Sequence, residues 1–208
     1  MINDRFGLLR LTAVAVLAAA LGGCVTIFPK EPPEQLYRFG PEPETAAAAP
    51  ATQRITVTSD RLGFNRAADT DRILTSSGDQ VAYIAGGRWA TPASLMFQGA
   101  LQQAFDASPG PVRLAARGDV QKADYSLRLN VVVFEARYEA GDKAAPTVFI
   151  EVRGTILRNT DRTVVGEQEF RATAAASDNR VGAIAQAFNA ATGQILGQIV
   201  TWTDQTAA

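Results

Sequence analysis

Hydrophobic and polar residues alternate along several stretches of the chain, and this period of two predicts β-strands. The clearest stretches are residues 54–58, 124–137, 147–158 and 163–173. Short turns separate the last three, which predicts an antiparallel meander. In the second stretch the period places an apolar set on one face of the strand: Tyr125, Leu127, Leu129, Val131 and Val133.

Weaker signals predict four further strands. Residues 72–75 and 80–85 flank the turn-forming run Ser77-Gly78-Asp79, which predicts a hairpin. Residues 112–116 predict a short strand. Residues 36–39 alternate within a proline-rich stretch, and we predict a short edge strand there that docks on the main sheet.

Apolar residues at intervals of three and four predict two amphipathic helices. The first spans residues 92–107, with Thr91 as its N-cap and Pro92 in its first position. The second begins near Asp178, a plausible N-cap, and has one long apolar stripe: Val181, Ile184, Phe188, Ala191, Ile195, Ile199 and Trp202. We therefore predict an α+β fold, in which both helices pack on one face of a largely antiparallel sheet.

The N-terminal end of the chain has a different pattern. A mildly basic segment, residues 1–10, precedes an uncharged apolar run over residues 11–21, as in a secretory signal. The run ends in Leu21-Gly22-Gly23-Cys24, which resembles the lipobox of bacterial lipoproteins. In such proteins the cysteine is acylated and becomes the mature N-terminus. An uncleaved membrane helix over residues 11–28 and a free thiol at Cys24 are the alternatives.

The lipobox interpretation divides the chain into three parts. Residues 1–23 are a lipoprotein signal peptide, and residues 24–53 are the acylated cysteine with a proline- and alanine-rich linker. Residues 54–208 are then long enough for one domain with a good core. The acyl chains would hold this domain at a membrane surface, since each buried methylene contributes about 0.8 kcal/mol.

Composition limits the chemistry of this domain. The net charge is −1, with no basic block, which argues against nucleic acid as a partner. The sequence has no histidine, the usual general base and zinc ligand, and Cys24 is its only cysteine. A Ser-Lys nucleophile would need Lys30, Lys122 or Lys143, which lie in linker or turn-like surroundings. We therefore predict no catalytic residues, no metal, no cofactor and no enzymatic activity.

Two neighbouring residues before the first helix, Arg88 and Trp89, are candidate contacts for a protein partner. The alternative is structural, with Trp89 closing the core and Arg88 in an ion pair. Glu167 and Glu169 share one strand face, which predicts a solvated face rather than an acid–base pair.

Several of these segments together resemble a known family. They are Arg72-Ile73 opening a strand, Val81-Ala82-Tyr83-Ile84, Arg88-Trp89-Ala90 before a helix, then a meander and a terminal helix behind a lipobox. This order resembles the ABC-type transport auxiliary lipoproteins, the family that includes the lipoprotein of the paraquat-inducible operon. The resemblance covers most of the mature chain, from about Leu36 to Trp202.

The resemblance implies a periplasmic, lipid-anchored accessory that docks on a transporter moving lipids between membranes. Its partners would be a permease, an ATPase and a substrate-binding protein with the mammalian-cell-entry domain, and the chain could form a homo-oligomer. Val25 follows the cysteine where an aspartate would favour the inner membrane in enteric bacteria, so we predict the outer membrane. Two other roles stay open: a structural lipoprotein of outer-membrane assembly or secretion, and a lipid carrier with its own pocket.

Overall fold

A computed structural model of the chain describes residues 34–40, 55–59, 62–115 and 122–207. They belong to one compact unit that begins at Glu34. The predicted signal peptide, Cys24 and Val25 lie outside the described residues. The described unit includes residues 34–40, which the sequence assigned to the linker.

In the described residues, nine strands form one mixed sheet, and two helices accompany it. The helices are α2 (Ala93–Ala107) and α3 (Val181–Ala207). The strands are β1 (Gln35–Tyr37), β2 (Ile55–Ser59), β3 (Gly63–Phe64), β4 (Arg72–Ser77), β5 (Gln80–Trp89), β6 (Val112–Leu114), β7 (Tyr125–Arg137), β8 (Thr147–Arg158) and β9 (Val164–Ala175).

The longest pairings are antiparallel. Strands β7, β8 and β9 form the predicted meander, and β4 and β5 form the predicted hairpin. The shorter strands join in parallel: β1 pairs with β5, β6 pairs with β2, and β2, β3 and β4 each pair with β7. The predicted α+β class with a largely antiparallel sheet is confirmed.

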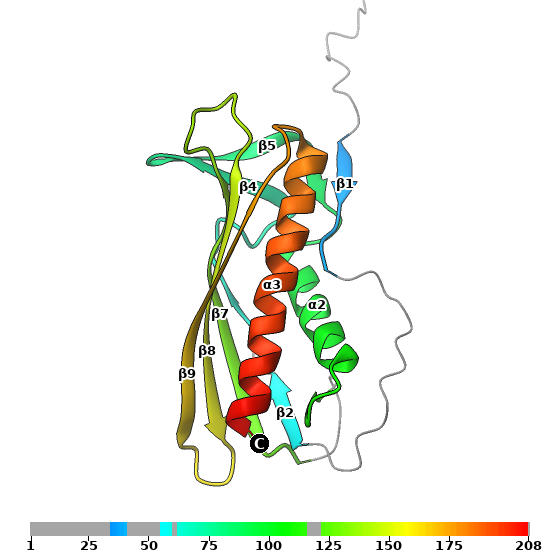
Figure 1. Cartoon of the computed structure of the whole chain (residues 1–208), viewed down its shortest axis with the longest axis vertical. Helices are drawn as coiled ribbons and strands as arrows, with labels where there is room; N and C mark the ends of the chain where they lie inside the picture. Colours follow the sequence, from blue (N-terminus) through cyan, green and yellow to red (C-terminus); the bar gives the residue numbers. More distant parts are fainter. Residues whose placement is uncertain (1–33, 41–54, 60–61, 116–121, 208) are drawn as a thin grey trace, which may run out of the picture. The chain divides into compact units, whose positions relative to one another are not determined.

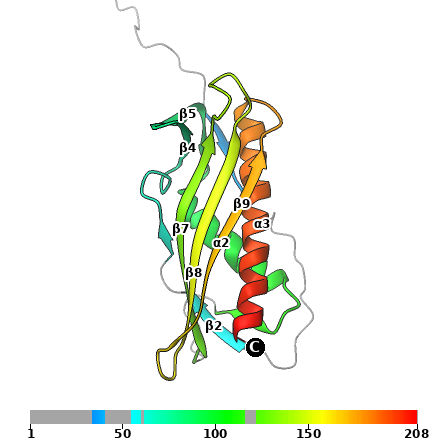
Figure 2. The same ribbon diagram turned by 60° about the vertical axis from the view of Figure 1, so that its left-hand side comes forward.

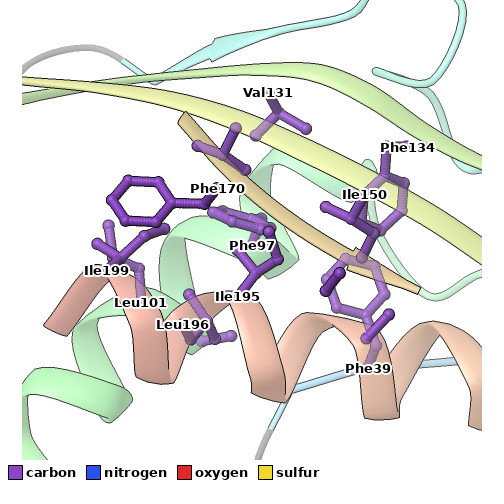
Figure 3. Packing of buried hydrophobic residues seen from close by; sticks show 14 of the residues in the cluster. Phe39, Phe97, Leu101, Val131, Phe134, Ile150, Phe170, Ile195, Leu196 and Ile199 are labelled. Carbon is purple, nitrogen blue, oxygen red and sulfur yellow. The ribbon is translucent and has the colours of Figure 1, made fainter. Parts of the chain in front are cut away.

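Both helices cover the same face of the sheet (Figures 1 and 2). Helix α3 runs along β8 and β9, while α2 packs beside α3 near β6. The core lies between the two layers, where Phe97 and Leu101 of α2 and Ile195 and Ile199 of α3 point toward apolar strand residues such as Ile150 (Figure 3). The predicted helical stripes are therefore the buried faces.

A β-bulge changes the buried face of β7. The pairing of β7 with β8 shifts between Val131 and Val133, so the inward alternation moves by one residue. Val131 is buried as predicted, but the next fully buried side chain is that of Phe134, and Val133 is only partly buried. The prediction that Val133 continues the inward face was therefore wrong.

The helix starts also differ from the predicted caps. Helix α2 begins at Ala93, with Pro92 at the cap position and no side-chain cap hydrogen bond. The Ala93 N–H instead donates to the Thr70 carbonyl at 3.1 Å, so a neighbouring loop replaces the predicted Thr91 cap. Helix α3 begins at Val181, three residues after Asp178.

The end of α3 has one acidic side chain that packs against a loop. Asp204 Oδ1 accepts a hydrogen bond from the Val112 N–H at 3.1 Å. Partial burial raises the pKa of the Asp204 carboxyl above its ordinary value, and the hydrogen bonds from Val112 and Ser108 offset only part of this effect. Its charged form is therefore disfavoured in the folded state.

We expect Asp204→Asn to raise stability slightly at neutral pH. A carboxyl with a raised folded pKa contributes stability below its unfolded pKa and loses this contribution as pH rises through the folded value. An amide oxygen can still accept the Val112 hydrogen bond, so the gain should be less than about 1 kcal/mol after solvent screening. Urea unfolding of both proteins across pH 4 to 8 measures this gain, which should grow with pH. A loss at pH 7 would show that the carboxylate charge is stabilising.

Candidate partner-contact site around Arg88 and Trp89

Strand β5 places Arg88 and Trp89 at its C-terminal end, where β1 joins the sheet. In the parallel β1–β5 pairing, Leu36 lies opposite Arg88 and Tyr37 lies opposite Trp89. The Ala90 N–H donates to the Tyr37 carbonyl at 2.7 Å and extends this pairing. The structure has a docked edge strand where one was predicted over residues 36–39, but it spans Gln35–Tyr37, so Arg38 and Phe39 lie beyond its end.

The Trp89 side chain lies in the core, with only 2% of its surface exposed. Its ring contacts Phe39 at 5.1 Å and Phe188 at 5.2 Å between centroids, both edge-to-face, and Phe134 at 6.4 Å. These rings come from the segment after β1, from β7 and from α3, so Trp89 joins three separate parts of the chain. Such edge-to-face contacts stabilise beyond the area they bury.

The Arg88 side chain lies on the surface between two acidic residues. Its Nη1 is 3.1 Å from Asp71 Oδ2, and its Nε donates to Glu34 Oε2. The hydrogen bond to Glu34 and then that to Asp71 raise the pKa of the Arg88 guanidinium further above its ordinary value. Arg88 therefore stays charged. It links Glu34, next to β1, to Asp71, next to β4.

The two candidate residues thus face opposite ways. A buried Trp89 cannot touch a partner without unfolding, whereas the Arg88 side chain is 42% exposed. A contact through Arg88 stays a prediction. Sequence reasoning missed these two carboxylates, because neither lies close to Arg88 in sequence.

A second polar cluster covers the outer face of the meander. Glu151 lies opposite Arg171, and Arg153 lies opposite Glu169, so that opposite charges face each other across β8 and β9. Glu151 is 3.6 Å from Arg153 and 3.2 Å from Arg171, and Glu169 contacts both arginines. These four charges neutralise one another on a solvated face, as cross-strand pairs do.

The described residues offer no arrangement suited to metal binding. No group of three or more acidic side chains there could hold a metal ion. None of the helices in the same residues is long and apolar enough to span a bilayer. The polar clusters around Arg88 and around Glu151 consist of ion pairs, and their charged side chains can bind a charged or polar partner.

We expect Arg88→Gln to change stability little. The ion pairs of Arg88 are exposed, and exposed pairs contribute about 0 to 1 kcal/mol. Urea unfolding of the variant should therefore shift by less than this amount. Arg158→Gln is the matched control, because Arg158 forms a similarly exposed pair with Asp161 at the other end of the sheet. A loss well above that of the control would give Arg88 a structural role.

Comparison with known proteins now identifies the class of this domain. The chain belongs to the family of ABC-type transport auxiliary lipoprotein components, whose pattern matches residues 37–200. The match begins at Tyr37, the last residue of β1, includes α2 and all the remaining strands, and ends within α3. Among proteins with curated functions, none matches the chain in sequence.

Solved structures share this fold. A protein of Xanthomonas campestris assigned to the DUF330 family is 24% identical, with a TM-score of 0.67 over 84% of this chain and 96% of that one. An uncharacterized protein is 12% identical, with a TM-score of 0.63 over 82% and 99%. A hypothetical protein of Chlamydia trachomatis is 7% identical, with a TM-score of 0.54 over 74% and 98%. At these identities the likeness concerns the fold alone.

Proposed function

We propose that this chain is a non-catalytic periplasmic accessory of an ABC-type system that moves lipids between membranes. The observation that carries the proposal is the family match over residues 37–200, which makes the chain a transport auxiliary lipoprotein component. The composition agrees with a binding role, because the sequence has no histidine and a single cysteine. The domain would then act through its position at the membrane and through the proteins that it binds.

The proposed anchor is Cys24. The Leu21-Gly22-Gly23-Cys24 run supports acylation of this cysteine after removal of residues 1–23. Two or three acyl chains would hold the protein on a bilayer almost permanently. Val25 supports the outer membrane as the destination. Intact-mass analysis of the protein from native membranes tests the anchor, and an intact Met1 or an unmodified thiol at position 24 would overturn it.

The proposed partner is the substrate-binding protein with the mammalian-cell-entry domain, which acts with a permease and an ATPase. Arg88, Glu34 and Asp71 form a charged surface on which such a protein could dock. Charged groups at an exposed site affect the association rate and specificity more than the total affinity. We therefore expect the partner to associate more slowly at high salt, which screens these exposed charges.

Co-purification tests the proposed function. The full chain with a C-terminal tag is captured from detergent-solubilised membranes, and the bound proteins are identified by mass spectrometry. Recovery of the three transporter components supports the proposal. Recovery of outer-membrane assembly or secretion proteins in their place would favour the structural alternative, and bound lipid in the purified domain would favour a carrier. The Arg88→Gln and Arg158→Gln variants, compared in the same experiment, test whether Arg88 contributes.

A further inference from the structure

Strand β9 forms a long open edge of the sheet. It spans Val164–Ala175, 12 residues, and among the described residues it pairs only with β8. By contrast, β1 and β6, which end the main strand order, have three residues each. Figure 2 shows β9 at the border of the meander, with α3 beside it. A long edge strand presents backbone N–H and C=O groups with which another strand can pair.

The odd-numbered residues of β9 turn their backbone groups toward this edge. Directly after the strand, the Ala176 N–H donates to the carbonyl that precedes β8 at 2.9 Å, so the even-numbered residues face β8. The carbonyls of Glu169 and Arg171 accept hydrogen bonds from side chains instead, from Gln168 at 3.2 Å and from Gln198 at 3.3 Å. Within the described chain, side chains reach this edge but no strand covers it.

The outer face of β9 carries charges in a self-complementary order. The exposed side chains of Glu167, Glu169, Arg171 and Thr173 follow one another on this face. If two copies of β9 pair antiparallel about a twofold axis at Phe170, each Glu169 lies opposite Arg171 of the other copy. Moving the axis by one residue, to position 169 or 171, would place two glutamates or two arginines directly opposite, which is destabilising. The charges therefore favour the register centred on Phe170.

This register also extends the ion-pair cluster of the meander. Within one chain, Arg153 lies opposite Glu169, and Glu151 lies opposite Arg171. Across the two chains, one row would read Arg153 and Glu169, followed by Arg171 and Glu151 of the second copy. The twofold axis creates the same row again on its other side. Opposite charges would then alternate across four strands, an arrangement that stabilises a sheet.

The helix layer is compatible with this pairing. Helix α3 runs along both β8 and β9, and neighbouring strands lie about 4.8 Å apart. A helix midway between these two strands would lie about 10 Å from its symmetry mate, close to the usual distance between packed helices. The side of α3 nearest the edge carries Gln198, and Asp204 is the only charged residue of Val181–Ala207. The two helices would therefore meet without strong charge repulsion.

We propose that two copies of this chain pair through their β9 edges, antiparallel about a twofold axis at Phe170, to form one continuous sheet. Backbone N–H groups of the second β9 would replace the glutamine amides at the Glu169 and Arg171 carbonyls. The interface is the same on both copies, as a twofold axis requires. This inference depends neither on the proposed anchor nor on the proposed transporter partners.

A proline in place of Thr173 tests the edge. The Thr173 N–H faces away from β8, so Thr173→Pro leaves the β8–β9 ladder intact but removes a donor that the second copy needs. Thr173→Ala is the matched control, because it removes the same hydroxyl and keeps the N–H. Each full chain is purified in detergent, light scattering measures its protein mass over a range of concentrations, and circular dichroism checks its fold.

We expect dimers for the native chain and for Thr173→Ala, and monomers for Thr173→Pro. A native chain that is monomeric at every concentration would overturn the proposal and leave the edge to another protein. Equal dimerisation of the proline and alanine variants would also overturn it, since the interface would then lie elsewhere.

Two charge reversals test the register, and they decide the matter if Thr173→Pro does not fold. In Glu169→Arg two arginines would face each other at both contacts of the dimer, and in Arg171→Glu two glutamates would. Each variant alone should therefore dimerise at least about tenfold more weakly than the native chain. In an equimolar mixture the introduced arginine faces the introduced glutamate, and the native residues face each other at the second contact. Dimers should return in the mixture, and their absence there, or undiminished dimers of either variant alone, would contradict the proposed interface.

Discussion

Replacement of Trp89 by alanine should destabilise the domain by about 3 to 5 kcal/mol, the cost typical of truncating a large buried aromatic side chain. The reason is that Trp89 fills the space between Phe39, Phe134 and Phe188, so its loss leaves a cavity bordered by three aromatic rings. Urea unfolding of the mature chain, followed by far-UV circular dichroism, measures the change. The midpoint should fall strongly while the folded spectrum stays similar.

The neighbouring residue provides the control for this experiment. Arg88→Gln changes an exposed side chain on the same strand and should cost less than about 1 kcal/mol. Trp89→Phe keeps an aromatic ring in the core and should fall between the two. If Trp89→Ala cost no more than Arg88→Gln, the tryptophan would not be a core residue, and a direct partner contact through it would again be open.

Phe39→Ala should also cost about 3 kcal/mol or more, because Phe39 is a buried aromatic residue. Its ring lies 5.1 Å from those of both Trp89 and Phe134, and it holds the segment that contains β1 against the core. We expect faster amide hydrogen exchange at Ala90, whose N–H donates to the Tyr37 carbonyl. Exchange followed by mass spectrometry or NMR, together with urea unfolding, measures both effects.

Leu36→Ala is the matched control for Phe39→Ala. Leu36 lies in β1, three residues before Phe39, but is mostly exposed, so its truncation should change stability by no more than about 0.5 kcal/mol. Ala90 exchange should then remain slow. Fast Ala90 exchange in the Leu36→Ala variant would contradict the view that Phe39, rather than the strand pairing, holds β1 in place.

The segment from Glu34 to Gly40, which includes Phe39, would transmit any force from the proposed anchor to the domain. Any force transmitted from Cys24 along the chain first reaches Glu34 and β1, before the rest of the domain. Glu34 contacts Arg88, the Gly40 N–H donates to Asn189 of α3 at 2.9 Å, and the Phe39 ring sits in the core. The proposed anchor is therefore connected to both layers of the fold through one short segment.

Local patterns in the sequence predicted most of the regular structure. The meander, the β4–β5 hairpin, both helices and their buried stripes follow from periods of two and of three to four residues, which each element carries within itself. The short strand β3 was missed, because two residues cannot show a period. It forms only through its parallel pairing with Asn130 and Val131 of β7.

The bulge in β7 depended on information that no single strand contains. Alternation alone predicts Val133 on the buried face, whereas the pairing with β8 shifts and buries Phe134. Phe134 contacts rings from β3, β5, α3 and the segment that follows β1, so burying the larger aromatic side chain is favoured. Which residue of β7 is buried therefore depends on the pairing with β8 and on the shape of the whole core.

Local sequence patterns were enough to predict the α+β class, the type and approximate position of most helices and strands, and the family resemblance. These features depend on local periodicity and on short runs such as Arg88-Trp89-Ala90. The folded arrangement was needed to show that Trp89 faces the core, that Arg88 contacts Glu34 and Asp71, and that Phe39 belongs to the domain. These contacts join residues that are distant along the chain. Their energies depend on burial and packing, which exist only once the sheet and the helices have come together.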